Sequence, residues 1–239
     1  MNQLQIGFLI YPEVIQLDVT AAYQVLSFPP NIETYLIGKT LKPLISNEGL
    51  ILTPTVDFDN CPQLDVICVP GGGMGQVEIM QDEVTLEFLQ RQAKQAQYIT
   101  SVCTGSMILA AAGLLQGYQA TCHWAFRDQL KMLGVEVVPQ RVVIDRNRIT
   151  GAGVTSGIDF GLILLDLLCG EDVAKMAQLM MEYNPQPPFN SGIPDTADPQ
   201  TVECLLNAGK PLIDAFRTQT QLGVGDLMYE LQNVSVRSS

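Results

Sequence analysis

Hydrophobic positions along this chain form short continuous runs, and segments with helical spacing separate these runs. Buried strands are predicted at 4–10, 33–37, 66–69 and 98–102, and further short strands at 135–138, 142–144 and 148–150. Helices are predicted at 19–27, at 83–95, directly after Cys103 and at 154–168. Strands that alternate with helices in this way predict an α/β fold, in which a mostly parallel sheet is covered by helices on both faces. In such a fold, functional residues lie at the carboxyl ends of the strands.

Length and composition predict one domain with a substantial core. The chain has 239 residues, of which 47% are hydrophobic and 16% are charged, so its composition is unlike that of a disordered chain. We expect the domain to span residues 1–223 and to be followed by a short C-terminal tail, 224–239, that is a candidate for disorder.

The net charge of the chain argues against nucleic acid and membranes as partners. The 13 Lys and Arg residues stand against 25 Asp and Glu residues, and the resulting net charge of −12 repels phosphate backbones and anionic membranes. Neither nucleic acid nor a membrane is therefore expected as a partner.

The N-terminus lacks a basic segment typical of a secretory signal, and no apolar run approaches the roughly 20 residues that span a bilayer. With one histidine and no C-x-x-C pair, no metal site is expected, and the predicted location is the cytoplasm.

Cys103 is the most informative residue of the sequence. An apolar, β-branched run stops at this cysteine, small residues follow, and a helix-forming segment begins at once. This pattern is typical of a nucleophile elbow, which lifts one side chain above the end of a strand, close to the N–H groups of a helix N-terminus. These groups favour a thiolate, so the pattern predicts a reactive sulfur. A cysteine outside such a context, as we expect for the other five, is more often a small buried hydrophobe.

Two glycine-containing segments follow other predicted strands and are candidates for the same site. The loop 70–75 lacks the spacing of a phosphate-binding loop. It is either a simple turn or a source of N–H groups, from Gly72 and Gly73, for charge that develops beside Cys103. The segment 151–157 has small residues that let a helix start approach the nucleophile closely, and its Val154 is a candidate substrate contact.

Several segments of the chain resemble the DJ-1/PfpI superfamily, from the N-terminus to about residue 220. They are Gln16–Thr20, Val69–Gly72, Ser101–Ser106, Ala120–Ala125 and Gly153–Phe160. Within the superfamily the chain is most similar to the isocyanide hydratases, because it also carries the late segments Glu182–Asn190 and Pro194–Ala197. The resemblance implies a flavodoxin-like fold with a cysteine nucleophile elbow, a homodimer, and no metal or organic cofactor. It also implies hydration of an isonitrile, R–N≡C, to an N-substituted formamide through a cysteine thioimidate.

Residue roles follow from the same resemblance. Cys103 is expected to attack the isonitrile carbon, and Asp18 to carry the proton from sulfur to carbon and then to activate water. Thr104 is expected to orient water or Asp18 through its hydroxyl and, with Gly72 or Gly73, to stabilise charge through its N–H group. Without the resemblance, the simpler interpretation of Asp18 is an N-cap of the helix that follows it.

Departures from other branches of the superfamily bear on the function. Thr104 stands where PfpI-type proteases carry histidine, and Asp18 stands where DJ-1 and glyoxalase-like members carry glutamate. Related transcriptional regulators append a helix-turn-helix module, which we do not expect here because few residues follow Gly223. His123 invites a Cys/His dyad but is more often a packed side chain, so we expect it near the site rather than as the base. Two alternatives stay open: another cysteine-dependent enzyme, glyoxalase-like or amide-processing, and a non-catalytic redox or ligand sensor.

The helix after Asp18 is a candidate for the homodimer contact. Ala21, Ala22 and Tyr23 lie on it, and the sequence pattern alone does not distinguish a subunit contact from residues that only cover the sheet.

Overall fold

The computed structural model describes residues 3–237 of the protein, and their side chains as far as residue 222. Seven strands form the central sheet, in the order β10-β11-β7-β6-β1-β2-β5. Their bounds are β1 (Leu4–Leu9), β2 (Ile32–Gly38), β5 (Val56–Asp57), β6 (Val66–Val69), β7 (Tyr98–Val102), β10 (Val142–Asp145) and β11 (Arg148–Gly151). Neighbouring strands are parallel except for the edge pair β10 and β11. The predicted α/β fold with a mostly parallel sheet is confirmed.

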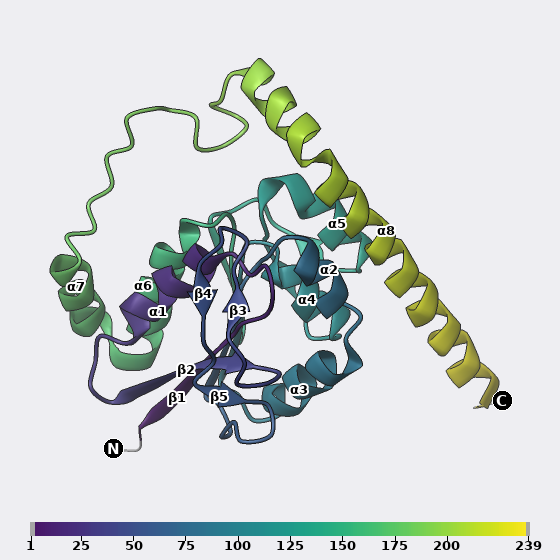
Figure 1. The fold of residues 1–239 in the computed structure, drawn as a ribbon, viewed down its shortest axis with the longest axis horizontal. Coiled ribbons are helices and arrows are strands. Elements are labelled where there is room, and N and C mark those ends of the chain that lie inside the picture. The colour runs from purple at the N-terminus through teal and green to yellow at the C-terminus, as the bar shows by residue number, and fades with distance from the viewer. Residues whose placement is uncertain (1–2, 238–239) are drawn as a thin grey trace.

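Helices cover both faces of this sheet (Figure 1). One face carries α1 (Gln16–Leu26), α6 (Ser156–Cys169) and α7 (Glu171–Met180), and the other carries α2 (Met74–Ile79), α3 (Glu83–Ala93), α4 (Gly105–Ala111) and α5 (Arg127–Met132). The long helix α8 (Pro199–Arg237) packs across α5, α2 and the short helix η1 (Trp124–Phe126). Two small ribbons complete the fold, β3 (Leu44–Ile45) with β4 (Ile51–Leu52), and β8 (Gln119–Ala120) with β9 (Glu136–Val137).

Continuous burial explains why the central strands could be predicted from the hydrophobic pattern of the sequence. All four residues of β6 are buried, as are the last four of β1, and a strand covered on both faces reads as an unbroken hydrophobic run. The prediction for 66–69 matches β6, whereas α1 begins at Gln16, before the predicted start at residue 19. The predicted domain boundary at residue 223 falls inside α8, which continues as a helix to Arg237.

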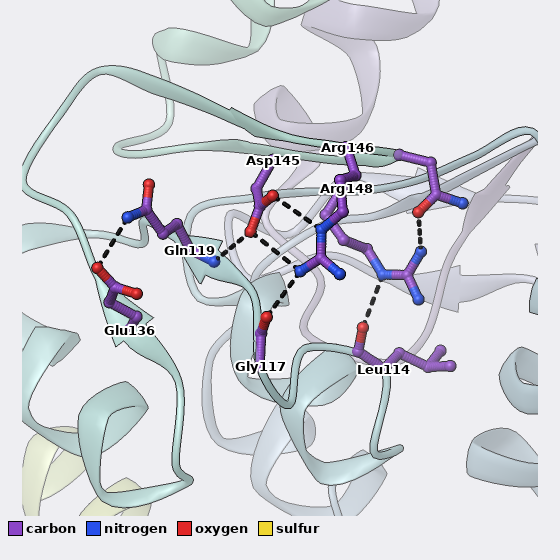
Figure 2. A network of polar contacts seen from close by, with 8 residues as sticks. Leu114, Gly117, Gln119, Glu136, Asp145, Arg146 and Arg148 are labelled. Carbon is purple, nitrogen blue, oxygen red and sulfur yellow. Dashed lines mark hydrogen bonds and ion pairs between the residues drawn. The ribbon is translucent and has the colours of Figure 1, made fainter.

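A polar network holds the β10–β11 hairpin against the segment that follows α4 (Figure 2). Asp145 accepts a hydrogen bond from the Gln119 backbone N–H at 2.8 Å and pairs with Arg146 at 3.0 Å. Arg148, which is buried, donates to the carbonyl oxygen of Leu114 at 2.7 Å. Since β11 pairs directly with β7, this network holds the neighbour of the strand on which the elbow is built.

Among the described residues, no helix combines the length and the apolar character that crossing a membrane requires.

Candidate active site

Cys103 occupies a sharp turn between β7 and α4, and the predicted elbow is confirmed. Its φ angle is +59°, a value that non-glycine residues rarely adopt and that is often found at functional sites. The Cys103 N–H donates to the carbonyl oxygen of Gly151 at 3.0 Å, so the end of β11 anchors the turn. Gly105 lets the start of α4 lie directly against β6, because a Cβ atom there would overlap the carbonyl oxygen of Val69.

Asp18 reaches the elbow from the first turn of α1. The N-cap of this helix is Ile15, and the Asp18 side chain makes no capping hydrogen bond, so the simpler interpretation as an N-cap is wrong. Its Oδ2 atom instead accepts a hydrogen bond from the Gly71 N–H at 2.9 Å, and the Cys103 thiol lies near enough to the carboxylate to lower its pKa. The Oδ1 atom is buried and has no partner among the described residues. One carboxylate oxygen is therefore left to interact with a substrate or water.

Burial sets the protonation of this pair. It raises the pKa of Asp18 from 3.8 to about 7, although the Gly71 N–H and the Cys103 thiol act in the opposite direction. Burial, followed by the nearby Asp18 charge, also raises the pKa of Cys103 well above 9.0, against the lowering effect of the Thr104 N–H. Burial thus opposes the preference for a thiolate that the helix start predicts, and it favours a Cys103 thiol beside a carboxylate that can take its proton.

The hydroxyl of Thr104 and the amides of the glycine loop form a buried network beneath the elbow. The Thr104 hydroxyl donates to Gln76 Oε1 at 2.6 Å, and the Gly72 N–H donates to the same oxygen at 2.7 Å. The Gly73 N–H donates to the carbonyl oxygen of Glu13 at 2.9 Å. Both loop amides thus have acceptors within the protein, and their predicted role toward the substrate stays a prediction. The Thr104 N–H is the amide that faces the Cys103 sulfur.

His123 lies in a packed setting, and its predicted place near the site stays a prediction. Its ring contacts Trp124 and Phe126, with centroid distances of 5.5 and 5.8 Å, and its Nδ1 accepts a long 3.3 Å hydrogen bond from the Ala125 N–H. Burial, together with Arg127, lowers its pKa. These contacts match the expectation of a packed side chain.

Val154 lies half-buried in the loop between β11 and α6. This loop follows Gly151, which anchors the elbow, and its Gly153 lies beside the His123 ring. A role of Val154 in substrate binding stays a prediction.

Two polar residues of the site were not predicted. Gln76 is fully buried and bonds to the loop and to the turn below Cys103. Tyr11, also buried, donates its hydroxyl to the carbonyl oxygen of Pro70 at 2.8 Å, and burial, followed by the charges of Asp18 and Cys103, raises its pKa. Both residues could have been found from their positions in the sequence. Tyr11 follows β1 and Gln76 lies in the first turn after the glycine loop, and both segments lie at the carboxyl ends of strands.

The described part of the chain contains no cluster of three or more His, Cys, Asp or Glu side chains that could hold a metal ion.

Comparison with known proteins gives relatives over most of the chain. Isonitrile hydratase from Pseudomonas putida is 54% identical over 200 residues, which cover 84% of this chain and 87% of that protein. The HTH-type transcriptional regulator GbdR from Pseudomonas aeruginosa is 31% identical over 196 residues, and the chain spans about half (51%) of its length. A crystal structure of a ThiJ/PfpI family protein from Pseudomonas syringae superposes with a TM-score of 0.89 at 41% identity, covering 92% of this chain and 91% of that one.

The family assignment agrees with the elbow and the sheet order. Residues 5–167 match the DJ-1/PfpI family, and this range includes Asp18, the glycine loop, Cys103 and the start of α6. The chain therefore belongs to the DJ-1/PfpI family.

Proposed function

We propose that this protein is an isonitrile hydratase, a cofactor-free hydro-lyase that converts R–N≡C and water to the formamide R–NH–CHO. The observation that carries the proposal is the buried Cys103 thiol on the elbow beside a buried Asp18 whose pKa lies near 7. The 54% identity to the isonitrile hydratase of Pseudomonas putida, over most of both chains, supports it.

The first half of the reaction uses the pair as one acid–base unit. As the sulfur of Cys103 attacks the terminal isonitrile carbon, its proton passes to Asp18, and an S–C bond forms. Asp18 then gives this proton to the same carbon, so that the S–H bond has been added across it and a thioimidate, R–N=CH–S, results. The free Oδ1 of Asp18 is the atom available for this delivery. A pKa near 7 suits a group that accepts and returns a proton at neutral pH.

The second half hydrolyses the thioimidate. Asp18, again a carboxylate, accepts one proton from water as the water oxygen attacks the thioimidate carbon, and passes this proton to the nitrogen. The C–S bond then breaks as the new hydroxyl group becomes the carbonyl of the formamide, and the hydroxyl proton returns to the sulfur through Asp18, which ends as a carboxylate. The Thr104 N–H stabilises negative charge on the sulfur as it departs.

The test compares the wild type with Cys103→Ser and Cys103→Ala in a spectroscopic assay of an aryl isonitrile. We expect both variants to fold and to lose activity by several orders of magnitude, since the nucleophile is removed. Intact-mass measurement during turnover is expected to detect a substrate adduct in the wild type and none in the variants. Retention of about a tenth of the activity in Cys103→Ala would reject a covalent role. A methylglyoxal assay run in parallel covers the glyoxalase-like alternative.

A homodimer is the assembly that we propose, but the structure does not favour the predicted contact on α1. Ala21 and Ala22 are buried within the chain, where α1 packs against α6, and the half-buried Tyr23 packs on Phe8 at 5.4 Å. These residues match the alternative of a helix that covers the core.

Exposed apolar side chains lie instead on α7 and the segment after it, which extends away from the sheet (Figure 1). Leu179 is 82% exposed and Phe189 is 78% exposed, and a second copy that covers this apolar surface is the partner we propose. Light scattering at micromolar concentration is expected to give a mass near twice 26.1 kDa. A mass near 26.1 kDa removes the dimer. We further propose a cytoplasmic location, with neither nucleic acid nor membrane as a partner.

A further inference from the structure

Gln76 joins the glycine loop to the turn that carries the nucleophile. It lies in the first turn of α2 and is completely buried. Its Oε1 accepts from the Gly72 N–H at 2.7 Å, and its Nε2 donates to the Thr104 carbonyl oxygen at 2.7 Å. An amide N–H only donates and a carbonyl only accepts, so these two bonds fix which end of the Gln76 amide is oxygen.

The fixed amide in turn fixes the hydroxyl proton of Thr104. The Thr104 Oγ1 lies 2.6 Å from Gln76 Oε1, and since this oxygen only accepts, the hydroxyl must donate to it. The same Oγ1 atom accepts from the Gly72 N–H at 3.3 Å and lies near the Cys103 sulfur. Because its proton is directed to Gln76, the hydroxyl is left to act toward the site through its remaining lone pair, as an acceptor. An acceptor can orient a water molecule that donates to it, but it has no proton to offer the Asp18 carboxylate. Of the two predicted roles of this hydroxyl, Gln76 selects the orientation of water.

The same side chain holds Thr104, the residue that follows Cys103. Through the Thr104 carbonyl it restrains the Thr104–Gly105 peptide at the start of α4. The preceding peptide, which carries the Thr104 N–H, lies on the other side of the Thr104 Cα and follows a residue with φ of +59°. A backbone in this region persists only where its surroundings hold it. The direction of the Thr104 N–H toward the Cys103 sulfur therefore depends on the bonds that Gln76 makes.

We propose that Gln76 is a positioning residue, which fixes the Thr104 hydroxyl as an acceptor for the attacking water and aims the Thr104 N–H at the Cys103 sulfur. The inference rests on the proposed hydratase function for the role of water, whereas the second part concerns the reactivity of the sulfur alone.

The experiment compares Gln76→Leu with Gln76→Glu at several pH values. Gln76→Leu removes every bond and is expected to lower kcat by about 100-fold, the effect of a misplacement of about 1 Å. Gln76→Glu keeps one donor and one acceptor only while its carboxyl group is protonated. Its activity relative to the wild type is therefore expected to be highest at low pH and to fall as the pH rises, which a merely structural role would not produce.

Gln92 supplies the matched control. It is also buried, and it likewise accepts from a backbone N–H, that of Leu64 at 3.0 Å, and donates to a backbone carbonyl, that of Pro62 at 2.9 Å. Gln92→Leu and Gln92→Glu are expected to lower stability without changing the pH profile of turnover. If they reproduce the pH-dependent loss, or if Gln76→Leu keeps turnover within about threefold of the wild type, the positioning role is overturned.

A double variant with Thr104→Val tests the proposal even if Gln76→Glu does not fold. Thr104→Val removes the hydroxyl at nearly constant volume, and the water-orienting part of the effect of Gln76→Leu should then disappear from the double variant. If the losses of kcat in the two single variants simply add in the double variant, Gln76 does not act through the Thr104 hydroxyl.

Alkylation of Cys103 by iodoacetamide, followed by peptide mass spectrometry, separates this inference from the proposed function. Gln76→Leu is expected to alkylate about tenfold more slowly, since a hydrogen bond to the developing thiolate is weakened. If the wild type hydrates no isonitrile but alkylation slows in Gln76→Leu, the hydratase proposal fails and the positioning of the sulfur stands. Equal alkylation rates in the wild type and in Gln76→Leu would refute the proposed positioning of the Thr104 N–H toward the sulfur.

Discussion

Replacement of Asp18 by asparagine is expected to stabilise the protein while it removes the activity. Asp18 is 2% exposed, and its pKa rises from 3.8 to about 7 on folding. The folded state therefore binds this proton more tightly than the unfolded state, and the free energy of unfolding falls as pH rises from 3.8 to about 7. Since one pKa unit corresponds to about 1.36 kcal/mol, the ionised carboxylate costs about 4 kcal/mol above this window.

Asparagine has no charge to bury, and its Oδ1 atom can still accept the hydrogen bond from the Gly71 N–H. The stability of Asp18→Asn relative to the wild type should therefore rise with pH. About 2 kcal/mol of this rise falls between pH 5.5 and pH 8.5, a range that avoids the isoelectric point near 4.3. Urea unfolding at fixed protein concentration, followed by circular dichroism at both pH values, measures it.

Asp82→Asn is a control that should show no pH dependence in this range. Partial burial raises the pKa of Asp82, but hydrogen bonds with Lys39 and Thr85 lower it more, so the net shift is downward from 3.8. Asp82 is therefore ionised in both the folded and the unfolded state at pH 5.5 and at pH 8.5, and the stability of this variant relative to the wild type should be the same at both pH values. If Asp18→Asn has the same relative stability at pH 5.5 and pH 8.5, the carboxylate is not buried as described, and the acid–base argument built on it is refuted. Near-normal turnover by Asp18→Asn would refute the proton transfer itself.

Three other predictions follow from the same geometry. The kcat/KM for an isonitrile should fall as pH falls below about 7, because protonated Asp18 cannot take the thiol proton; a flat profile between pH 5.5 and pH 8.5 would contradict this. Gly71→Ala should reduce kcat by at least about 100-fold in a steady-state assay, since its Cβ would lie 2.5 Å from Thr104 Oγ1 and 2.8 Å from Asp18 Oδ2. Full activity of this variant would mean that the site can adjust to the extra methyl group, and it would contradict the prediction. Phe216→Ala should cost about 3–5 kcal/mol in chemical denaturation, because this buried ring packs on Phe126 at 5.0 Å; a loss below about 1 kcal/mol would mean that α8 is not anchored there.

The sequence predicted the features that depend on local pattern. β6 was visible because it is buried on both faces, and the elbow was visible because a strand, small residues and a helix meet at Cys103. α7 and α8 were not predicted. The side chains of α7, and those of α8 as far as residue 222, are largely exposed, so the apolar positions of these helices do not form the long buried runs by which the other elements were predicted.

Features that depend on three-dimensional burial were predicted less well. The raised pKa of Cys103 was missed because desolvation depends on what packs around the turn, and the sequence shows only the helix start. Gln76 was missed for a related reason. Its importance comes from bonds to Gly72 and to a residue 28 positions later, Thr104, and an uncharged glutamine carries no chemical signature of its own.

The tight contact between Gly105 and Val69 bears on how this enzyme scaffold can diversify. With no space for even one methyl group there, the side of the elbow that faces β6 does not tolerate a larger residue. The loop between β11 and α6 is less constrained: a Cβ at Gly153 would make an ordinary 3.7 Å contact with His123, and Val154 and Thr155 are partly or fully exposed. Selection for larger or differently shaped substrates, in nature or in the laboratory, should therefore accumulate its changes in this loop and leave the side of the elbow that faces β6 unaltered.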